Sequence, residues 1–219
     1  SLPGQKFGLT ELKIKQILKF KNLTKKYFPT LNFEFIVSTN CEKVFLFIKK
    51  YPWIKIHERR NNLATDDSLD RLIRIVPKIC KGDHILWTHV TSPRFDHLEY
   101  LNFIKTFLKK TKFHKSAFSA DKLQKFLFSK KKWISHNKNK KKWPRTQDLT
   151  PVYVANSAAF IANREVYSKD HDRICSNPLP IVSKLNKSMD IDDLNDFENL
   201  KYLLKNVKKI SKKDLFSKF

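Results

Sequence analysis

The first half of the chain shows two patterns of apolar and polar positions. Apolar residues at helical spacing predict helices, and short apolar runs between them predict buried strands. The expected helices cover residues 10–28, 42–50, 66–79 and 96–110, and the expected strands are Phe33–Val37, Trp53–Ile56 and Ile85–Val90. Pro29 ends the first helix, and Pro77 is expected to disturb the third. Strands that alternate with helices predict an α/β protein with an open sheet and right-handed crossovers.

The second half of the chain has a less regular pattern. Strands are expected at residues 115–120, 125–128, 156–162 and 180–185, and a closing helix at residues 194–208. Lys125 to Trp143 forms an excursion that is too long for an ordinary connection, so we expect an exposed arm at residues 125–143. The final segment, Lys212 to Phe219, is expected to be loosely held.

The length and the cysteines narrow the class of protein. A chain of 219 residues is long enough for one sizeable core. No apolar run approaches a membrane span of roughly 18 to 20 residues, and no signal peptide is visible. Cys41, Cys80 and Cys175 are far apart and odd in number, which gives neither a disulfide framework nor a zinc spacing. These features favour a cytoplasmic protein in a reducing environment.

The formal net charge of +24 comes mostly from lysine. Together with many Asn, Phe and Ile residues, this composition is typical of an AT-rich coding sequence. Two lysine clusters, 130–132 and 138–142, lie near Trp133 and Trp143 and could bind nucleic acid through its phosphates. The alternative is a solvated basic hairpin, and both alternatives agree with a general attraction for anionic nucleotides. Only three glycines occur, so no Gly-rich phosphate loop is intact.

Asp190 and Asp192 form the most informative pair of residues. Ile191 separates them as at the end of a strand, and a period of two places both carboxylates on one face. Two such carboxylates repel each other unless a cation lies between them, and hard oxygen ligands suit Mg²⁺. The alternative is an acidic helix cap formed by Asp192–Asp196.

Polar residues follow several of the predicted strands, where ligands bind in open α/β sheets. Five segments occur in a fixed order, namely Leu2–Lys6, Ile36–Asn40, Arg59–Asp66, His89–Pro93 and Ser188–Asp192, with Arg145–Leu149 and Asn156–Ile161 between the last two. This ordered set resembles the acylneuraminate cytidylyltransferase family, the CMP-sialic acid synthetases, over nearly the whole chain.

The resemblance implies a fold, an activity and partners. The implied fold is one Rossmann-like nucleotidyltransferase domain over residues 1–219, with helices on both faces of the sheet and residues 125–143 as a dimerisation arm. The implied activity transfers CMP from CTP to a sialic-acid-like 2-keto sugar acid and releases pyrophosphate, with Mg²⁺ as cofactor. The implied partners are CTP, an acidic sugar and a second copy of the chain, with no membrane and no specific nucleic acid.

The resemblance also assigns roles to residues. Asp190 and Asp192 would hold the metal, and the catalytic residues would be Lys6, Arg59 and Asp192. The nucleotide would contact Leu2, Gln5, Arg59, Asn61 and Thr65. The sugar acid would contact His89, Thr91, Ser92, Arg145, Gln147 and Asn156. Simple structural roles remain open for several of them: His89 as a hydrogen-bonded histidine, Thr91–Pro93 as a helix start, and Gln147 and Asn156 as partners of loop backbone.

The resemblance is incomplete at the N-terminus. The family begins with an apolar strand and a loop that contains Arg and Gly, whereas this sequence starts at Ser1-Leu2-Pro3, so the first strand is missing. The family's Leu-Pro-x-Lys-Asn is replaced by Leu2–Lys6, with the lysine displaced by one place. The chain is therefore either part of a longer product or a member with impaired activity. Three hypotheses follow: a cytidylyltransferase, a non-catalytic binding protein of that family, and a basic nucleic-acid-binding domain.

Overall fold

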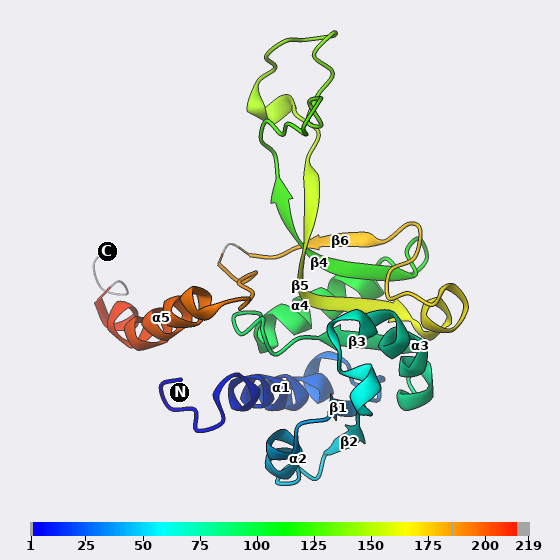
Figure 1. Ribbon diagram of the computed structural model, residues 1–219, viewed down its shortest axis with the longest axis vertical. Helices are drawn as coiled ribbons and strands as arrows, with labels where there is room; N and C mark the ends of the chain where they lie inside the picture. The colour runs from blue at the N-terminus through cyan, green and yellow to red at the C-terminus, as the bar shows by residue number, and fades with distance from the viewer. Residues whose placement is uncertain (1, 185, 214–219) are drawn as a thin grey trace.

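The computed structural model describes residues 2–184 and 186–213. Within them the chain forms two β-sheets and five α-helices (Figure 1). The strands are β1 (Phe35–Thr39), β2 (Ile54–Glu58), β3 (His84–Thr88), β4 (Ser116–Leu123), β5 (Val152–Asn163) and β6 (Leu179–Val182). The helices are α1 (Gly8–Tyr27), α2 (Glu42–Ile48), α3 (Leu69–Ile79), α4 (His97–Leu108) and α5 (Leu194–Lys213).

The larger sheet has the strand order β3-β5-β4-β6 and is mixed in direction. β5 pairs antiparallel with both β3 and β4, and β6 runs parallel to β4. β1 and β2 form a separate parallel pair. Among the described strands, β1 and β3 are not hydrogen-bonded to each other, so the two sheets are separate.

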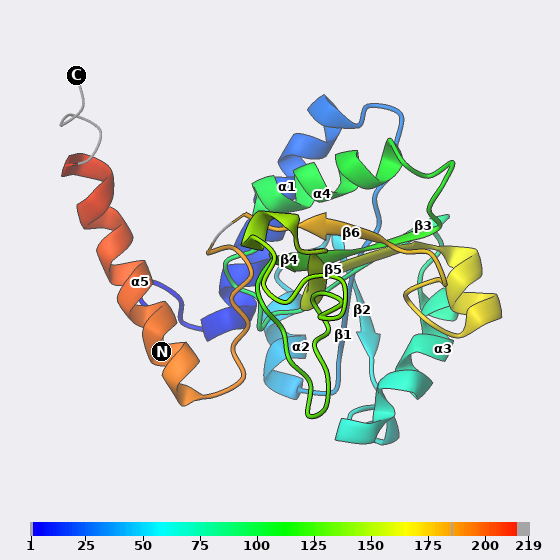
Figure 2. The same cartoon turned by 90° about the horizontal axis from the view of Figure 1, so that it is seen from above.

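Helices cover both faces of the larger sheet (Figure 2). Neighbouring residues of a strand point to opposite faces, and β3 shows this directly. Leu86 packs against the cluster that Phe20 of α1 and Phe103 of α4 form on one face, whereas Ile85 packs against Ile73 of α3 on the other. The prediction of an α/β protein with helices on both faces of an open sheet is therefore confirmed.

Every helix and strand expected in the first half is present, with bounds shifted by a few residues. The helix α3 continues through Pro77 and ends two residues later, at Ile79, so the proline marks its last turn. The strand expected at residues 125–128 is wrong, because only an isolated bridge between Phe128 and Trp133 forms there. Within the strand expected at residues 180–185, Leu185 lies outside the described residues.

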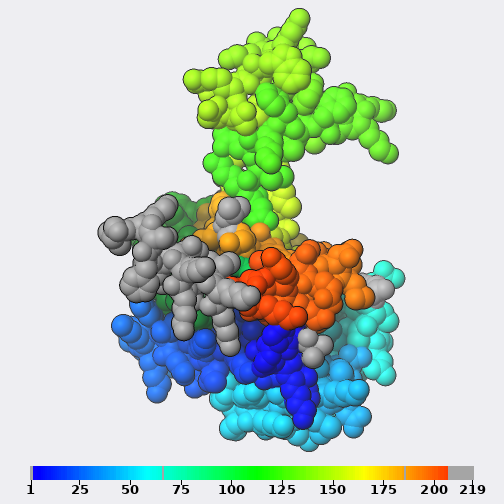
Figure 3. Space-filling view, turned by 90° about the vertical axis from the view of Figure 1, so that its left-hand side faces the viewer, coloured from blue at the N-terminus to red at the C-terminus, as the bar shows by residue number. Residues whose placement is uncertain are grey.

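The C-terminal helix lies beside the α/β body rather than inside it (Figures 1 and 2). In Figure 3 it lies directly above the N-terminal segment, and Leu200 is fully buried while Tyr202 is 69% exposed. The segment expected to be loosely held begins inside this helix, and residues 214–219 lie outside the described residues. No helix in the part of the chain that is described has the length and apolar character needed to cross a membrane.

Candidate active site

The carboxyl end of β3 and the segment before α5 meet, although they are nearly 100 positions apart in the sequence. The amide of Ile191 donates a hydrogen bond to the carbonyl of Thr91, with an N–O distance of 2.9 Å. The hydroxyl of Ser92 donates to Oδ1 of Asp190 at 3.4 Å. Three residues expected from the sequence, Thr91, Ser92 and Asp190, therefore lie together at a strand end.

Lys13 of α1 lies directly behind this strand end. Its Nζ donates hydrogen bonds to the carbonyls of Ser92 (2.8 Å) and Phe95 (3.2 Å) and to the hydroxyl of Tyr100 (2.9 Å). Lys13 is 4% exposed, and this burial lowers the pKa of its ammonium group to about 7, although the charges of Asp96 and Asp190 oppose the shift. The result is a buried amino group, bonded to neutral acceptors, close to a carboxylate.

Sequence reasoning missed Lys13, although the sequence carries a signal for it. Residues 13, 17, 20 and 24 fall on one stripe of a helix, and the other members of that stripe are Ile17, Phe20 and Thr24. A lysine in a stripe that faces the core needs buried hydrogen-bond acceptors. The sequence could not supply these acceptors, because they come from residues 92–100.

Arg173 is the second residue that the sequence did not indicate. Its guanidinium carbon lies 3.7 Å from the ring centroid of Phe160 and 5.5 Å from that of Trp87. Its Nη1 lies 3.3 Å from Nε2 of His89. Since a guanidinium only donates, Nε2 of His89 must accept, which requires a neutral ring. Burial, followed by the charge of Arg173, lowers the pKa of His89, which favours the neutral ring.

The guanidinium of Arg173 forms no hydrogen bond to an acidic side chain among the described residues. It forms no ion pair with them either. Burial lowers the pKa of this guanidinium, although the nearby charge of Asp172 acts to raise it. Arg173 follows the five-residue π-helix Val166–Asp170 and lies in an irregular loop. A partly buried cation stacked on an aromatic ring suits an anionic ligand.

Arg59 lies at the carboxyl ends of β1 and β2. Its Nη2 donates to the carbonyl of Ser38 at 2.9 Å and its Nε to the hydroxyl of Ser38 at 3.3 Å. Nδ1 of His57 lies 3.0 Å from the same hydroxyl. Asn61 begins the short 3₁₀-helix Asn61–Leu63, and Thr65 precedes a second one, Asp66–Ser68. Both residues are exposed, and the hydroxyl of Thr65 accepts from Arg71. No hydrogen bond or ion pair within the described part of the chain joins Arg59 to Asp190.

The N-terminal residues form a tight turn. Leu2 is buried, and its carbonyl accepts from the amide of Gln5 at 3.0 Å. Gly4 has φ +71°, which glycine adopts without strain. The side-chain oxygen of Gln5 accepts from Nζ of Lys15 at 3.0 Å, and Lys6 is exposed. The turn therefore bonds to α1, and none of its hydrogen bonds reaches Asp190.

The three polar residues near the arm take part in local bonds. Arg145 forms a bidentate ion pair with Asp148, with both N–O distances at 3.1 Å. The carbonyl of Gln147 accepts from Gln124. Nδ2 of Asn156 donates to Ser183 at 3.0 Å and to Asp121 at 3.3 Å. The structure does not bring these residues into contact with the Ser92–Asp190 pair.

Residues 190–196 combine an irregular segment with a helix cap. The strand end expected around Ile191 is wrong, because residues 188–192 have no regular structure. The cap is present and starts at Asp193, whose Oδ1 accepts from the amide of Asp196 at 2.9 Å, while Oδ2 of Asp196 accepts from the amides of Asp192 and Asp193. This reciprocal arrangement is a capping box. It uses neither the carboxylate of Asp190 nor that of Asp192.

The donor set fits Mg²⁺ bound together with a phosphate ligand. Asp190 accepts hydrogen bonds only through Oδ1, and the exposed carboxylate of Asp192 accepts none among the described residues. The described part of the chain has no group of three or more His, Cys, Asp or Glu side chains that would enclose a metal. Mg²⁺ in nucleotide sites is commonly held by one or two carboxylates, substrate phosphates and water.

Two solved structures share this architecture. The 4-diphosphocytidyl-2C-methyl-D-erythritol synthase from Anaerococcus prevotii aligns over 94% of this chain and 91% of its own, with a TM-score of 0.64 and 11% identity. A CMP:2-keto-3-deoxy-manno-octonic acid synthetase complexed with CTP aligns over 90% of this chain and 88% of its own, with a TM-score of 0.56 and 11% identity. No protein-family model and no curated protein matches the sequence. The chain therefore has the Rossmann-like fold of these two nucleotidyltransferases.

Proposed function

We propose that this protein is a cytidylyltransferase that transfers CMP from CTP to a sialic-acid-like 2-keto sugar acid and releases pyrophosphate. The observation that carries the proposal is the cluster at the carboxyl end of β3. A carboxylate suited to a metal, Asp190, lies there with the buried Lys13 and with His89, which contacts the unpaired cation of Arg173. In open α/β sheets, ligands bind outside the carboxyl ends of strands. Two proteins of similar fold agree with this proposal, since one is a 4-diphosphocytidyl-2C-methyl-D-erythritol synthase and the other is a CMP:2-keto-3-deoxy-manno-octonic acid synthetase complexed with CTP.

The proposed reaction joins two anions. The anomeric hydroxyl of the sugar acid attacks the α-phosphate of CTP and loses its proton to water. A new P–O bond forms, and the bond to pyrophosphate breaks. Positive groups must offset the repulsion between the reactants and the charge that develops on pyrophosphate. Bound Mg²⁺, held by Asp190 and Asp192, would supply part of that charge at the phosphates. No nucleophilic side chain is required.

The protein's own cations divide this work by position. Lys13 uses its hydrogen bonds to hold residues 92–95, so it acts on the site by placing that loop. Arg173 presents a planar guanidinium without an acidic partner, which suits the carboxylate of a sugar acid. Arg59, held by Ser38, suits the nucleotide phosphates at the neighbouring strand ends.

One observation favours the second candidate, a binding protein of the same fold without catalysis. The turn at Leu2–Lys6 directs the side chain of Gln5 to Lys15 and leaves Lys6 exposed. None of its hydrogen bonds reaches the cluster at β3. A protein of this fold could bind the nucleotide through its other contacts. Without contacts from the N-terminal turn to the phosphates, it would not position them for reaction.

The experiment compares thermal shifts for CTP, ATP, GTP and UTP, each with and without Mg²⁺, and measures pyrophosphate release with N-acetylneuraminate. We expect a Mg²⁺-dependent shift with CTP that Asp190→Asn and Asp192→Asn abolish. Without ligand, these variants keep or raise Tm, because the repulsion between the carboxylates is relieved. Asp193→Asn is the control, since asparagine caps a helix about as well as aspartate.

Three outcomes separate the alternatives. Identical ligand-induced shifts in the wild type and all three variants would remove the metal site. Equal shifts with all four nucleotides would remove the preference for cytidine. A CTP shift without pyrophosphate release would favour the binding protein over the enzyme.

A further inference from the structure

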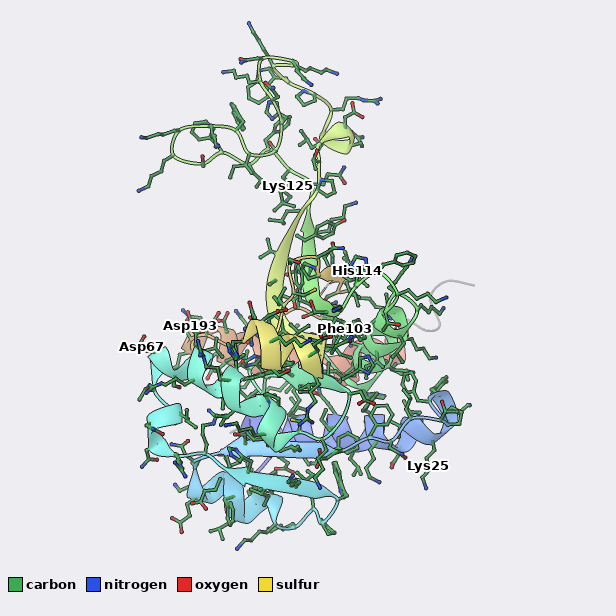
Figure 4. The ribbon with its side chains drawn as sticks, turned by 90° about the vertical axis from the view of Figure 1, so that its right-hand side faces the viewer. Lys25, Asp67, Phe103, His114, Lys125 and Asp193 are labelled. Atoms are coloured by element: carbon green, nitrogen blue, oxygen red, sulfur yellow. The ribbon has the colours of Figure 1, made fainter. Side chains whose placement is uncertain are left out.

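The arm between β4 and β5 projects from the body, with Lys125 at its base (Figures 1 and 4). Its aromatic side chains form one cluster, in which the ring centroids of Trp133 lie 5.0 Å from Phe128, 5.6 Å from Trp143 and 6.1 Å from Phe126. The cluster is nevertheless open to solvent, because Phe128 is 59% and Trp143 is 65% exposed. These aromatic rings are gathered at the surface, outside the α/β core.

The arm has a defined shape held by its own hydrogen bonds. The amide of Leu127 donates to Oγ of the buried Ser135 at 3.1 Å, and the carbonyl of Leu127 accepts from the amide of Ile134 at 2.8 Å. The surface of the arm contains a hollow of about 580 Å³. It is lined by aromatic, basic and amide side chains, namely Phe128, Lys131, Lys132, Trp133, His136, Asn137, Lys138 and Asn139.

The charge of the arm has one sign. Residues 125–143 contain eight lysines and no acidic residue. All eight lysines are exposed, and within the described residues none of them forms an ion pair. The surface around the aromatic rings is therefore a field of unneutralised positive charge.

This charge argues against a second copy of the chain as the partner of the arm. Subtracting the eight lysines from the 45 basic residues leaves 37, against 21 acidic residues, in the rest of the chain. The arm and the remaining surface therefore carry the same sign of net charge, and their contact would be opposed by repulsion. Charge complementarity points to a polyanion instead.

We propose that the arm is a binding surface for single-stranded nucleic acid. Lysines that track phosphates, together with aromatic faces on which bases stack, are the combination that binds single strands without sequence preference. A hollow lined by rings, His136 and two asparagines suits an unstacked base. An anionic membrane typically binds an amphipathic helix, and residues 125–143 form no helix. This inference does not depend on the cytidylyltransferase proposal.

The test measures binding of a fluorescent oligothymidylate of about 20 nucleotides, of a duplex of equal length, and of vesicles that contain an anionic lipid. The role of the lysines is tested with three proteins, each with the full chain. The first is the wild type, and the second changes Lys130, Lys131 and Lys132 to alanine. The control changes Lys109, Lys110 and Lys112, three exposed lysines near the end of α4, and removes the same charge.

We expect the wild type to bind the single strand more tightly than the duplex, with log K falling linearly as log salt rises. The arm variant should reduce that slope by roughly 2, since single strands contribute about 0.7 for each neutralised phosphate. The control should leave the slope unchanged. Trp143→Ala should weaken single-strand binding by about tenfold or more and spare duplex binding, while Trp143→Phe should restore most of it.

Three results would overturn the proposal. Equal loss in the arm variant and in the control would show that only net charge matters. Binding to vesicles without binding to the oligonucleotide would assign the arm to a membrane. A dimer in light scattering that the arm variant converts to a monomer would assign the arm to self-association. An unchanged Tm in each variant shows that the fold is intact.

Discussion

At the residue scale, the buried Lys13 makes stability depend on pH. The ammonium group has an ordinary pKa of about 10.5 in the unfolded chain and a pKa of about 7 in the folded protein. Between these values the unfolded chain binds more protons, so the free energy of unfolding rises with pH. Below pH 7 the group is charged in both states, and the full cost of burying the charge remains.

We predict that the free energy of unfolding of the wild type rises relative to that of Lys13→Met by about 2 kcal/mol between pH 7 and pH 9. Methionine keeps most of the volume and does not titrate. Urea unfolding of both proteins at several pH values measures the difference. A difference that is constant over this range would contradict a neutral Lys13 in the folded state.

Lys13 and Arg173 also show where prediction from sequence stops at this scale. The sequence singles out Thr91, Ser92 and Asp190, and all three belong to the cluster, although the strand end expected at Asp190 is absent. Arg173 lies in a loop without a motif. Its role depends on stacking against Phe160, which is 13 positions away in strand β5. Contacts of this kind come from packing, and a local pattern does not encode them.

At the element scale, the alternation of apolar and polar residues predicted nearly every helix and strand. The prediction failed at residues 125–128, where apolar side chains pack within the arm and do not belong to a strand of a sheet. Phe126, Leu127 and Phe128 form a short apolar run as in a strand, but the partners of the two phenylalanines are the rings of Trp133 and Trp143 within the arm. Apolar spacing alone does not distinguish a strand that pairs with a sheet from a loop that folds around its own side chains.

The capping box of α5 gives a prediction for a single element. Asp193→Ala removes the acceptor for the amide of Asp196, and losing such a cap costs about 1 kcal/mol. Because α5 lies beside the body, we expect the loss to appear as local opening. Trypsin should then cleave at Lys201 and Lys205 roughly five times faster than in the wild type.

Asp193→Asn is the matched control for that prediction, since it keeps the capping oxygen and removes the charge. It should be cleaved at nearly the wild-type rate. Equal acceleration in both variants would mean that the negative charge at the helix N-terminus, rather than the hydrogen bond, stabilises α5. Neither variant is expected to change cleavage in the α/β body.

At the scale of the whole molecule, the two separate sheets differ in how many strand pairings and buried apolar contacts stabilise them. β5 is paired on both sides, by β3 and β4, and is covered on both faces. β1 and β2 pair only with each other and rest on a small cluster that Ile14, Phe47, Ile48 and Ile54 form. Units with fewer buried contacts open at a lower free energy than the rest of a protein.

We therefore predict that residues 35–58 exchange amide hydrogens before residues 152–163 as denaturant is added. Hydrogen exchange followed by mass spectrometry of peptides from both regions measures the order. Simultaneous exchange would show that the sheets unfold as one unit. The bond to Ser38 holds Arg59 within this unit, and the proposed function places Arg59 against the nucleotide phosphates. CTP with Mg²⁺ should therefore slow exchange in residues 35–58 most, and Arg59→Ala should remove that protection. Protection by CTP that persists in Arg59→Ala would place the nucleotide against β3 alone.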